Sequence, residues 1–161
     1  MASKTNPAQV TELLLQALET ERGGIQIYTA AIKAAQNEDL KEEWQEYLDE
    51  TRTHEEILVR VFGELGLDTE QQSPGRSVVA HQGKSLVAAI KLAMDTADPA
   101  AAELVAAECV VLAETKDHQN WELIGHVAKH ATGGEAKVLK TAFDAVEKDE
   151  DHHLYHTMGW C

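Results

Sequence analysis

The sequence contains few of the residues that cross-link secreted proteins or interrupt helices. Two of its 161 residues are cysteines and three are prolines. Cys109 and Cys161 form no recognisable metal-binding or redox motif, so nothing indicates an oxidising compartment. Apolar runs fall short of the roughly 20 residues that a membrane-spanning helix needs, and none occurs near the first residue. We therefore expect no signal peptide and no membrane anchor, and we predict a cytoplasmic protein.

Positive charge is scarce as well. The chain has 14 Lys and Arg residues against 28 Asp and Glu residues, and its formal net charge at pH 7 is -14. Nucleic acids and anionic lipid surfaces bind proteins through clustered cations, so we expect no nucleic-acid partner and no membrane partner. The length suits one domain with a sizeable core, which we assign to residues 1–161.

Helix boundaries are the clearest positive signals. Asparagine or aspartate precedes proline at Asn6-Pro7 and at Asp98-Pro99, which predicts helices that begin at these prolines. Asn37 is expected to cap a further helix, and Thr132-Gly133-Gly134 interrupts the last helical pattern. Four long helices are predicted, over residues 7 to about 35, 37 to about 63–66, 99 to about 131, and about 135 to 161.

The connection between the second and third long helices spans many residues. Residues 68–77 contain Gln-Gln-Ser-Pro-Gly and are predicted to form a loop. The apolar periodicity of residues 85–94 predicts a short crossover helix that covers the bundle. Alternation typical of β-strands does not occur over any useful length. The expected fold is all-α, with two antiparallel helical hairpins joined by this long crossover.

Each long helix carries an apolar stripe that polar side chains interrupt. Residues three and four apart lie on one helix face, which packs against neighbouring helices. The stripes are Leu14, Leu18, Glu21, Ile25, Tyr28 and Ile32; Leu40, Trp44, Tyr47, Thr51, His54, Leu58, Val61 and Leu65; Leu104, Ala107, Val111, Glu114, His118 and Trp121; and Leu139, Phe143, Val146, Glu150, His153, Thr157 and Trp160. Buried carboxylates on such faces need cations or proton donors beside them.

Distances along the hairpins place the polar residues at one level. In an antiparallel pair, residues equally far from the turn lie side by side. Glu21 and His54 are nearly equidistant from Asn37, and Glu114 and His153 are nearly equidistant from Gly133-Gly134. Each hairpin is therefore predicted to set a glutamate beside a histidine. The predicted metal ligands are Glu21, His54, Glu114, Glu150 and His153.

The two halves of the chain repeat one pattern. Glu21 and Glu114 are each followed seven residues later by an aromatic residue. The motif Glu150-x-x-His153 in the fourth long helix corresponds to Thr51-x-x-His54 in the second. The second helix thus carries an incomplete copy, with a hydroxyl where the other copy has a carboxylate.

This arrangement resembles the ferritin-like superfamily, which includes bacterioferritin and rubrerythrin. Its bundles take one glutamate from each of two helices and a Glu-x-x-His motif from each of the other two. The resemblance implies Glu21 and Glu114 as the single ligands, Glu150 with His153 as one motif, and His54 as the histidine of the other. Residues 48–66 and the crossover look most similar to small bacterial YciE/YciF-like stress proteins.

Thr51 departs from the family pattern, and three further residues are candidate ligands that would compensate. Glu50 stands four residues before His54. Asp117 stands three residues after Glu114, where rubrerythrin-like proteins often carry an additional glutamate. His118 lies one turn after Glu114 on the same stripe. The ligand set is therefore expected to be shuffled, asymmetric or able to hold only one metal ion.

A buried layer of carboxylates neutralised by imidazolium is the structural alternative to a metal site. Such a layer is a weak source of stability, because each desolvated ion costs free energy before it is paired. A divalent cation satisfies several carboxylates together and accepts neutral imidazole, so we favour the metal site. The nearby aromatic residues Tyr28, Tyr47 and Trp121 are expected to pack in the core, with electron relay or hydrogen bonds to the acids as the alternative roles.

Carboxylate and imidazole ligands suit Fe, Mn or Zn, and they do not choose among these metals. The first hypothesis is a stress-related bundle protein that binds one or two ions and reacts them with O2 or H2O2 as an oxidoreductase or peroxidase. The second is a non-catalytic stress or structural protein with a degenerate metal site, which Thr51 favours. Iron storage would require a closed shell of many subunits, whereas we expect a homodimer.

Overall fold

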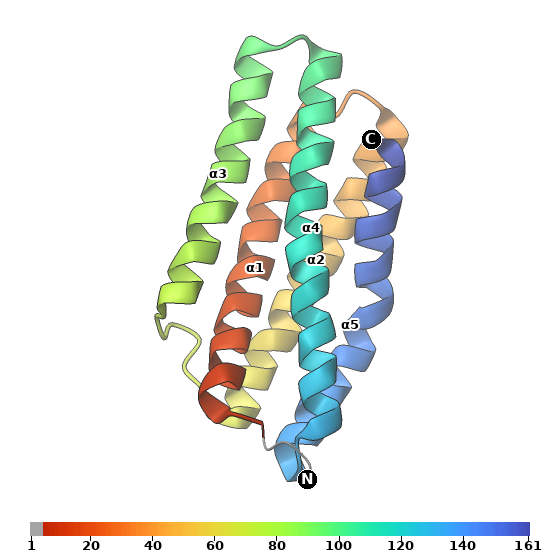
Figure 1. Cartoon of the computed structure of the whole chain (residues 1–161). Coiled ribbons are helices and arrows are strands. Elements are labelled where there is room, and N and C mark those ends of the chain that lie inside the picture. Colours follow the sequence, from red (N-terminus) through yellow and green to blue (C-terminus); the bar gives the residue numbers. More distant parts are fainter. Residues whose placement is uncertain (1–4) are drawn as a thin grey trace.

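The computed structural model describes residues 5–161, which form five α-helices joined by short connections (Figure 1). The helices are α1 (Pro7–Ala34), α2 (Glu38–Leu65), α3 (Pro74–Thr96), α4 (Pro99–His130) and α5 (Gly133–Trp160). No strand occurs in the described residues, which confirms the all-α prediction. Within the same residues, no helix combines the length and the apolar character needed to cross a membrane.

Capping residues and prolines mark the start of four of the five helices. Each of the three prolines stands in the first turn of a helix, and the residue before each proline accepts a hydrogen bond from a backbone N–H of that turn. Asn37 caps α2 in the same way. Gly66 ends α2 with φ of 69°, in the left-handed region that glycine adopts without a steric penalty.

Helix α3 is longer than the sequence analysis predicted. It begins at Pro74 rather than near Ser85, so the predicted loop over residues 68–77 is confined to residues 66–73. Ser73-Pro74 is a cap-and-proline pair like the other two, but the surrounding polar residues obscured it. Buried Arg76 fixes this start, since its guanidinium donates to two loop carbonyls at 2.6 and 2.9 Å and to Glu19 of α1 at 3.0 Å.

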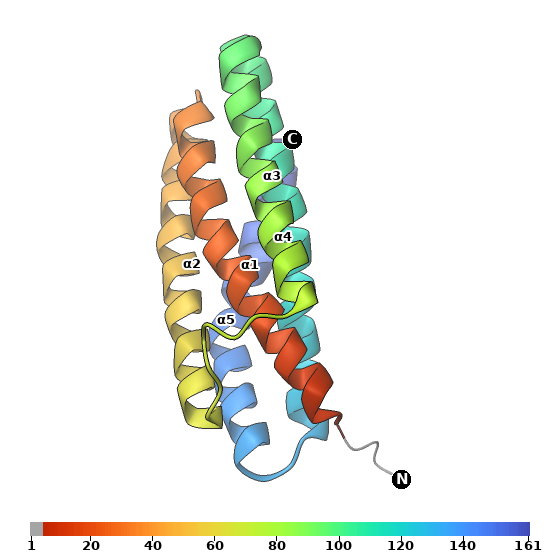
Figure 2. The ribbon, with the colours of Figure 1, turned by 90° about the vertical axis from the view of Figure 1, so that its left-hand side faces the viewer.

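Helices α1, α2, α4 and α5 form a four-helix bundle. α1 packs against α2 and α4, and α5 packs against the same two helices. The chain direction makes each of these neighbouring pairs antiparallel (Figure 1). Helix α3 lies outside the four, against α1 and α4 (Figure 2). The hairpins α1–α2 and α4–α5 therefore pack against each other, and α3 provides the crossover between them.

The apolar core is divided into two clusters by a buried polar layer. One cluster includes Trp44, Tyr47 and Ile90, and the other includes Leu18 and Phe62. The layer between them contains Glu21, Thr51, His54, Glu114, Asp117, Glu150 and His153. Because apolar side chains close the layer on both sides, its charges must be met by protein groups, protons or a bound cation.

The predicted stripe on α4 is partly wrong. Leu104 is 45 % exposed, whereas Val110, Asp117 and Asn120 are buried. α4 packs against three helices, α1, α3 and α5, so its buried face is wider than one stripe and rotated from the predicted one. The last residue of the stripe on α5, Trp160, is also 41 % exposed.

Candidate metal centre

Six acidic and histidine side chains from four helices converge inside the bundle. Each is at most 5 % exposed, and we call this set the buried cluster: Glu21, His54, Glu114, Asp117, Glu150 and His153. Each helix of the bundle contributes at least one of them. The structure thus brings together all five principal predicted ligands and adds Asp117, one of the three further candidates.

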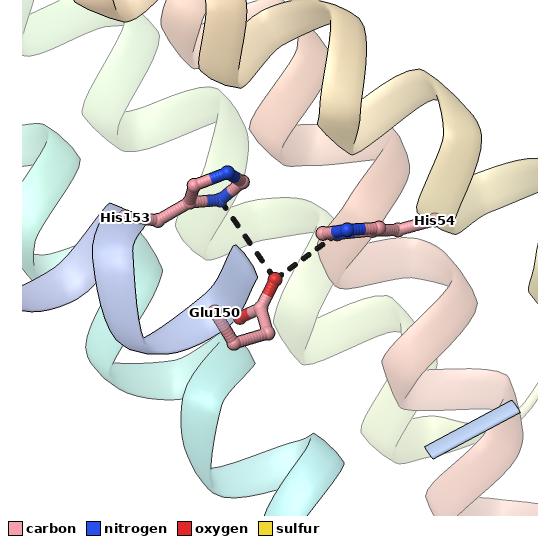
Figure 3. Close-up of side chains that lie close together, drawn as sticks. All are labelled: His54, Glu150 and His153. Carbon is pink, nitrogen blue, oxygen red and sulfur yellow. Dashed lines mark ion pairs between the residues drawn. The ribbon is translucent and has the colours of Figure 1, made fainter. Parts of the chain in front are cut away.

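Glu150 lies at the centre of the buried cluster. Its Oε1 is 3.1 Å from Nδ1 of His54 and 3.8 Å from Nδ1 of His153 (Figure 3). The two imidazole rings stack with centroids 5.6 Å apart. Glu21 lies 3.7 Å from Nδ1 of His54, and Glu114 lies 3.7 Å from Nδ1 of His153. Each hairpin sets its glutamate beside its histidine, as the equal distances from the turns predicted.

In each histidine of the cluster, Nε2 points away from Glu150 and contacts an acid of the other hairpin. Nε2 of His54 lies 3.0 Å from Asp149, and Nε2 of His153 lies 2.7 Å from Glu50. A neutral imidazole that donates from Nε2 carries its lone pair on Nδ1, the atom that faces the cluster in both residues. Metal-bound histidines use this arrangement, in which an outer acid fixes the tautomer and the orientation of the ring.

Aromatic donors hold two of the glutamates, again across the hairpins. Nε1 of Trp121 donates to Glu21 at 2.7 Å, and the hydroxyl of Tyr28 donates to Glu114 at 2.7 Å. Tyr28 and Trp121 therefore belong to the core clusters and also form the hydrogen bonds to the acids that were the less favoured alternative. Both are buried, and a buried N–H or O–H group needs an acceptor. Tyr47 packs against His153, with ring centroids 4.4 Å apart and ring planes tilted by 41°.

Seven nitrogen and oxygen atoms of the buried cluster form no hydrogen bond of good geometry, although two of them, Nδ1 of His54 and Oε1 of Glu150, lie 3.1 Å apart. They are Oε2 of Glu21, Nδ1 of His54, Oε2 of Glu114, Oδ1 of Asp117, both carboxylate oxygens of Glu150 and Nδ1 of His153. Unpaired buried polar atoms cost free energy, so a positive group, either protons or a metal ion, is needed among them. Four carboxylates and two imidazoles match the ligand preference of divalent iron, manganese or zinc.

Two groups of three residues have donor atoms close enough to share an ion. One is His54, Glu150 and His153, and the other is Glu21, Asp117 and Glu150. Within each group the donor atoms lie within 4.8 Å of one another. Because Glu150 belongs to both groups and both of its oxygens lack partners, it is suited to lie between two ions.

Burial and mutual repulsion shift the proton affinities of the acids. Burial, followed by the charge of Asp117, raises the pKa of Glu21 and of Glu150 well above the usual range. Burial and the charge of Glu114 raise the pKa of Asp117 to about 8. Without a metal, these carboxyl groups keep their protons to a higher pH than the same groups do in water. A bound cation would displace those protons.

The two histidines differ in proton affinity although their positions correspond. Burial lowers the pKa of His54, and the hydrogen bond with Asp149 only partly offsets this effect. Burial also disfavours the charged form of His153, but its contacts with Glu114 and Glu50 outweigh burial and raise its pKa to about 10. His153 therefore holds its proton more tightly than His54 does.

The remaining predicted ligands lie outside the buried cluster. Glu50 faces Nε2 of His153, the nitrogen directed away from Glu150, and so contacts the buried cluster from outside. His118 does not reach the cluster, because Glu114 and Asp117 are the acids of α4 that face inward. Its Nε2 lies 2.9 Å from Asp151 at the surface between α4 and α5.

Sequence reasoning missed the role of Asp149. This residue stands four positions before His153, as Glu50 stands four positions before His54. Each acid holds the histidine of the other helix. The repeat between the halves contains this signal, an acid four residues before each histidine. That spacing suggests a contact within one helix, whereas the observed contacts run across the bundle.

One pair of positions breaks the correspondence between the halves. Thr51 and Gly24 stand where the other half has Glu150 and Asp117. The hydroxyl of Thr51 donates to the backbone carbonyl of Tyr47 at 2.7 Å, and a Cβ on Gly24 would lie 3.3 Å from the methyl group of Thr51. Small groups fill this half of the site, and the other half supplies two additional carboxylates.

Comparison with protein-family models, curated proteins and solved structures finds no match to this chain. The function is therefore inferred from the chemistry of the site itself.

Proposed function

We propose that the buried cluster binds one or two divalent metal ions, and that the loaded protein is a ferritin-like oxidoreductase that acts on O2 or H2O2. Iron is the first candidate, with manganese and zinc as alternatives for binding. The observation that carries this proposal is the set of seven unpartnered donor atoms. The arrangement of two antiparallel hairpins with a crossover supports the ferritin-like assignment. A bound redox metal supplies the electron-transfer chemistry.

The residues of the chain have three separable tasks in this proposal. The acids of the buried cluster neutralise the cation, and His54 and His153 add nitrogen ligands. Trp121 and Tyr28 donate to one oxygen of a glutamate each and leave the other oxygen free. The apolar clusters on both sides exclude water, which strengthens every electrostatic contact with the ion.

Metal loading tests the proposal directly. Protein incubated anaerobically with Fe(II), desalted and analysed for metal is expected to retain iron. Glu21→Ala, Glu150→Ala and His153→Ala should each reduce the retained iron. His126→Ala is the control, because His126 is exposed on α4. A wild-type protein that stays free of metal would contradict the proposal.

A non-catalytic protein with a degenerate metal site is the second candidate. Thr51 and Gly24 favour it, because they remove carboxylates from one half of an otherwise repeated site. Peroxide consumption by the iron-loaded protein distinguishes the two functions. Turnover above that of the same amount of free iron supports the oxidoreductase, and turnover equal to that of free iron supports the non-catalytic protein.

A further inference from the structure

A hollow of about 280 Å³ lies between α4 and α5, and Glu150 of the buried cluster is one of the residues that line it. We call it the α4–α5 hollow. Its lining includes His118, Trp121, Glu122, Glu147, Glu150 and Asp151. No lysine or arginine is among the residues that line it, so the charge of this surface is negative.

The inner end of the hollow is part of the candidate metal centre. Glu150 is only 1 % exposed, and neither of its carboxylate oxygens has a hydrogen-bond partner. Trp121, which also lines the hollow, donates to Glu21 of the cluster. Four other hollows on the described part of the chain contain no residue of the buried cluster.

The outer end of the hollow carries an imidazole between two acids. Nε2 of His118 on α4 lies 2.9 Å from Asp151 on α5, and its Nδ1 lies 3.9 Å from Glu122. The side chain of His118 is 16 % exposed, and those of Asp151 and Glu122 are 55 % and 68 % exposed. A nitrogen donor and two carboxylates therefore stand within reach of solvent, ahead of the unpartnered carboxylate of Glu150.

We propose that divalent cations reach the buried cluster through the α4–α5 hollow, captured first by His118 and Asp151 and then passed to Glu150. Carboxylates around a hollow with low-dielectric walls raise the local concentration of cations and the rate of association. An arriving ion replaces the contact between His118 and Asp151 with contacts of its own. This inference rests on the proposed metal binding, and it adds the path by which the ion arrives.

The test uses Co(II) alone as the probe, because its visible absorption changes when nitrogen and oxygen ligands replace water. Association is followed by stopped-flow mixing with the full chain. The hollow variant carries Glu122→Gln and Asp151→Asn. The matched control carries Glu64→Gln and Asp95→Asn, which change the net charge equally at exposed positions that do not line the hollow.

The hollow variant is expected to bind Co(II) with an association rate about tenfold lower than that of the wild type, whereas the control stays within about twofold. The amount of Co(II) bound at saturation should be the same in all three proteins. His118→Ala should also slow association, since it removes a first ligand without removing a negative charge. An unchanged rate in His118→Ala would overturn the capture role of that residue.

The outcomes separate the route from the site. If the wild type binds Co(II) and the hollow variant matches the control in rate, the route is overturned and the metal centre stands. If the wild type and Glu150→Ala give the same Co(II) signal, or neither gives one, both the route and the proposed function are overturned.

Discussion

Tyr28 and Trp121 show how single hydrogen bonds act across the bundle. Each side chain donates a hydrogen bond to a glutamate of a neighbouring helix, and in each case the second carboxylate oxygen has no partner. Partners of this kind fix the direction in which a ligand presents its lone pairs, and their loss weakens metal affinity without removing a ligand. In the proposed metal centre, Tyr28 and Trp121 would therefore affect the affinity for the ion without contacting it.

Trp121→Phe is expected to weaken Co(II) binding by about tenfold or more, because it removes the indole N–H that donates to Glu21. Competition with a chelator of known affinity measures the change. Trp44→Phe is the matched control, since Trp44 is fully buried but its Nε1 has no partner. Equal weakening in both variants would show that packing, rather than the hydrogen bond, is responsible.

The raised pKa of Asp117 predicts how the stability of the metal-free protein changes with pH. Its pKa of about 8 in the folded protein exceeds the value of about 3.9 expected for an unfolded aspartate. The folded state then binds the proton more tightly, so this contribution to stability is present below the unfolded pKa and is lost as pH rises through the folded pKa. Glu21, Glu150 and His153 act in the same direction, and His54 acts in the opposite one.

The free energy of unfolding of the metal-free protein is therefore expected to fall between about pH 4 and pH 8. Urea unfolding in the presence of a chelator measures it. Asp117→Asn should flatten the dependence, because the amide does not titrate. Asp144→Asn, at an exposed position of α5, should not alter it. If the free energy of unfolding changes with pH equally in both variants, Asp117 does not contribute to the pH dependence.

At the scale of helices, the sequence predicted the elements better than the contacts between them. Caps and prolines predicted the four long helices, and equal distances from the turns predicted which residues share a level. The rotation of α4 was not predictable, because it depends on α3 packing against that helix. The start of α3 was hidden by its polar neighbours. The crosswise partners of the ligands, such as Asp149, depend on how the two hairpins dock, which no local pattern encodes.

Thr51 of α2 stands where α5 has Glu150, and this difference can be tested by substitution. Thr51→Glu restores a carboxylate on α2 and is expected to raise the number of ions bound per chain, measured by elemental analysis. The absence of a Cβ at Gly24 keeps the contact with this position from tightening, since an added Cβ would lie 3.3 Å from the methyl group of Thr51. Thr53→Glu, on the exposed face of the same helix, is the control. An unchanged metal content in Thr51→Glu would argue against the incomplete-copy interpretation.

The close approach of α4 and α5 depends on Gly125. A Cβ at this position would lie 2.7 to 2.9 Å from ring atoms of Phe143. Gly125→Ala is therefore expected to lower the free energy of unfolding by about 1–3 kcal/mol, which is typical of overpacking. Denaturant unfolding measures the change. Gly134→Ala is the control, because no atom lies within 4 Å of an added Cβ there, and a comparable loss in that variant would count against the steric explanation.

At the scale of the whole molecule, a charged layer divides the core in two, and bound metal would convert that layer from a cost into a gain. A ligand present at 100 times its dissociation constant stabilises a protein by about 2.7 kcal/mol if it binds only the folded state. Adding Mn(II) to the metal-free protein should therefore raise its Tm. His153→Ala should show no such response, and an equal rise in that variant would place the stabilising ion elsewhere.

The crosswise contacts also determine when the site comes into existence. Asp149 orients a histidine of α2, Glu50 orients a histidine of α5, and the indole and phenol groups are exchanged between α1 and α4 in the same manner. Neither hairpin alone can aim its own ligands. If the buried cluster binds metal as proposed, tight capture of an ion requires that both hairpins have already docked, so the ion would stabilise only the complete tertiary structure.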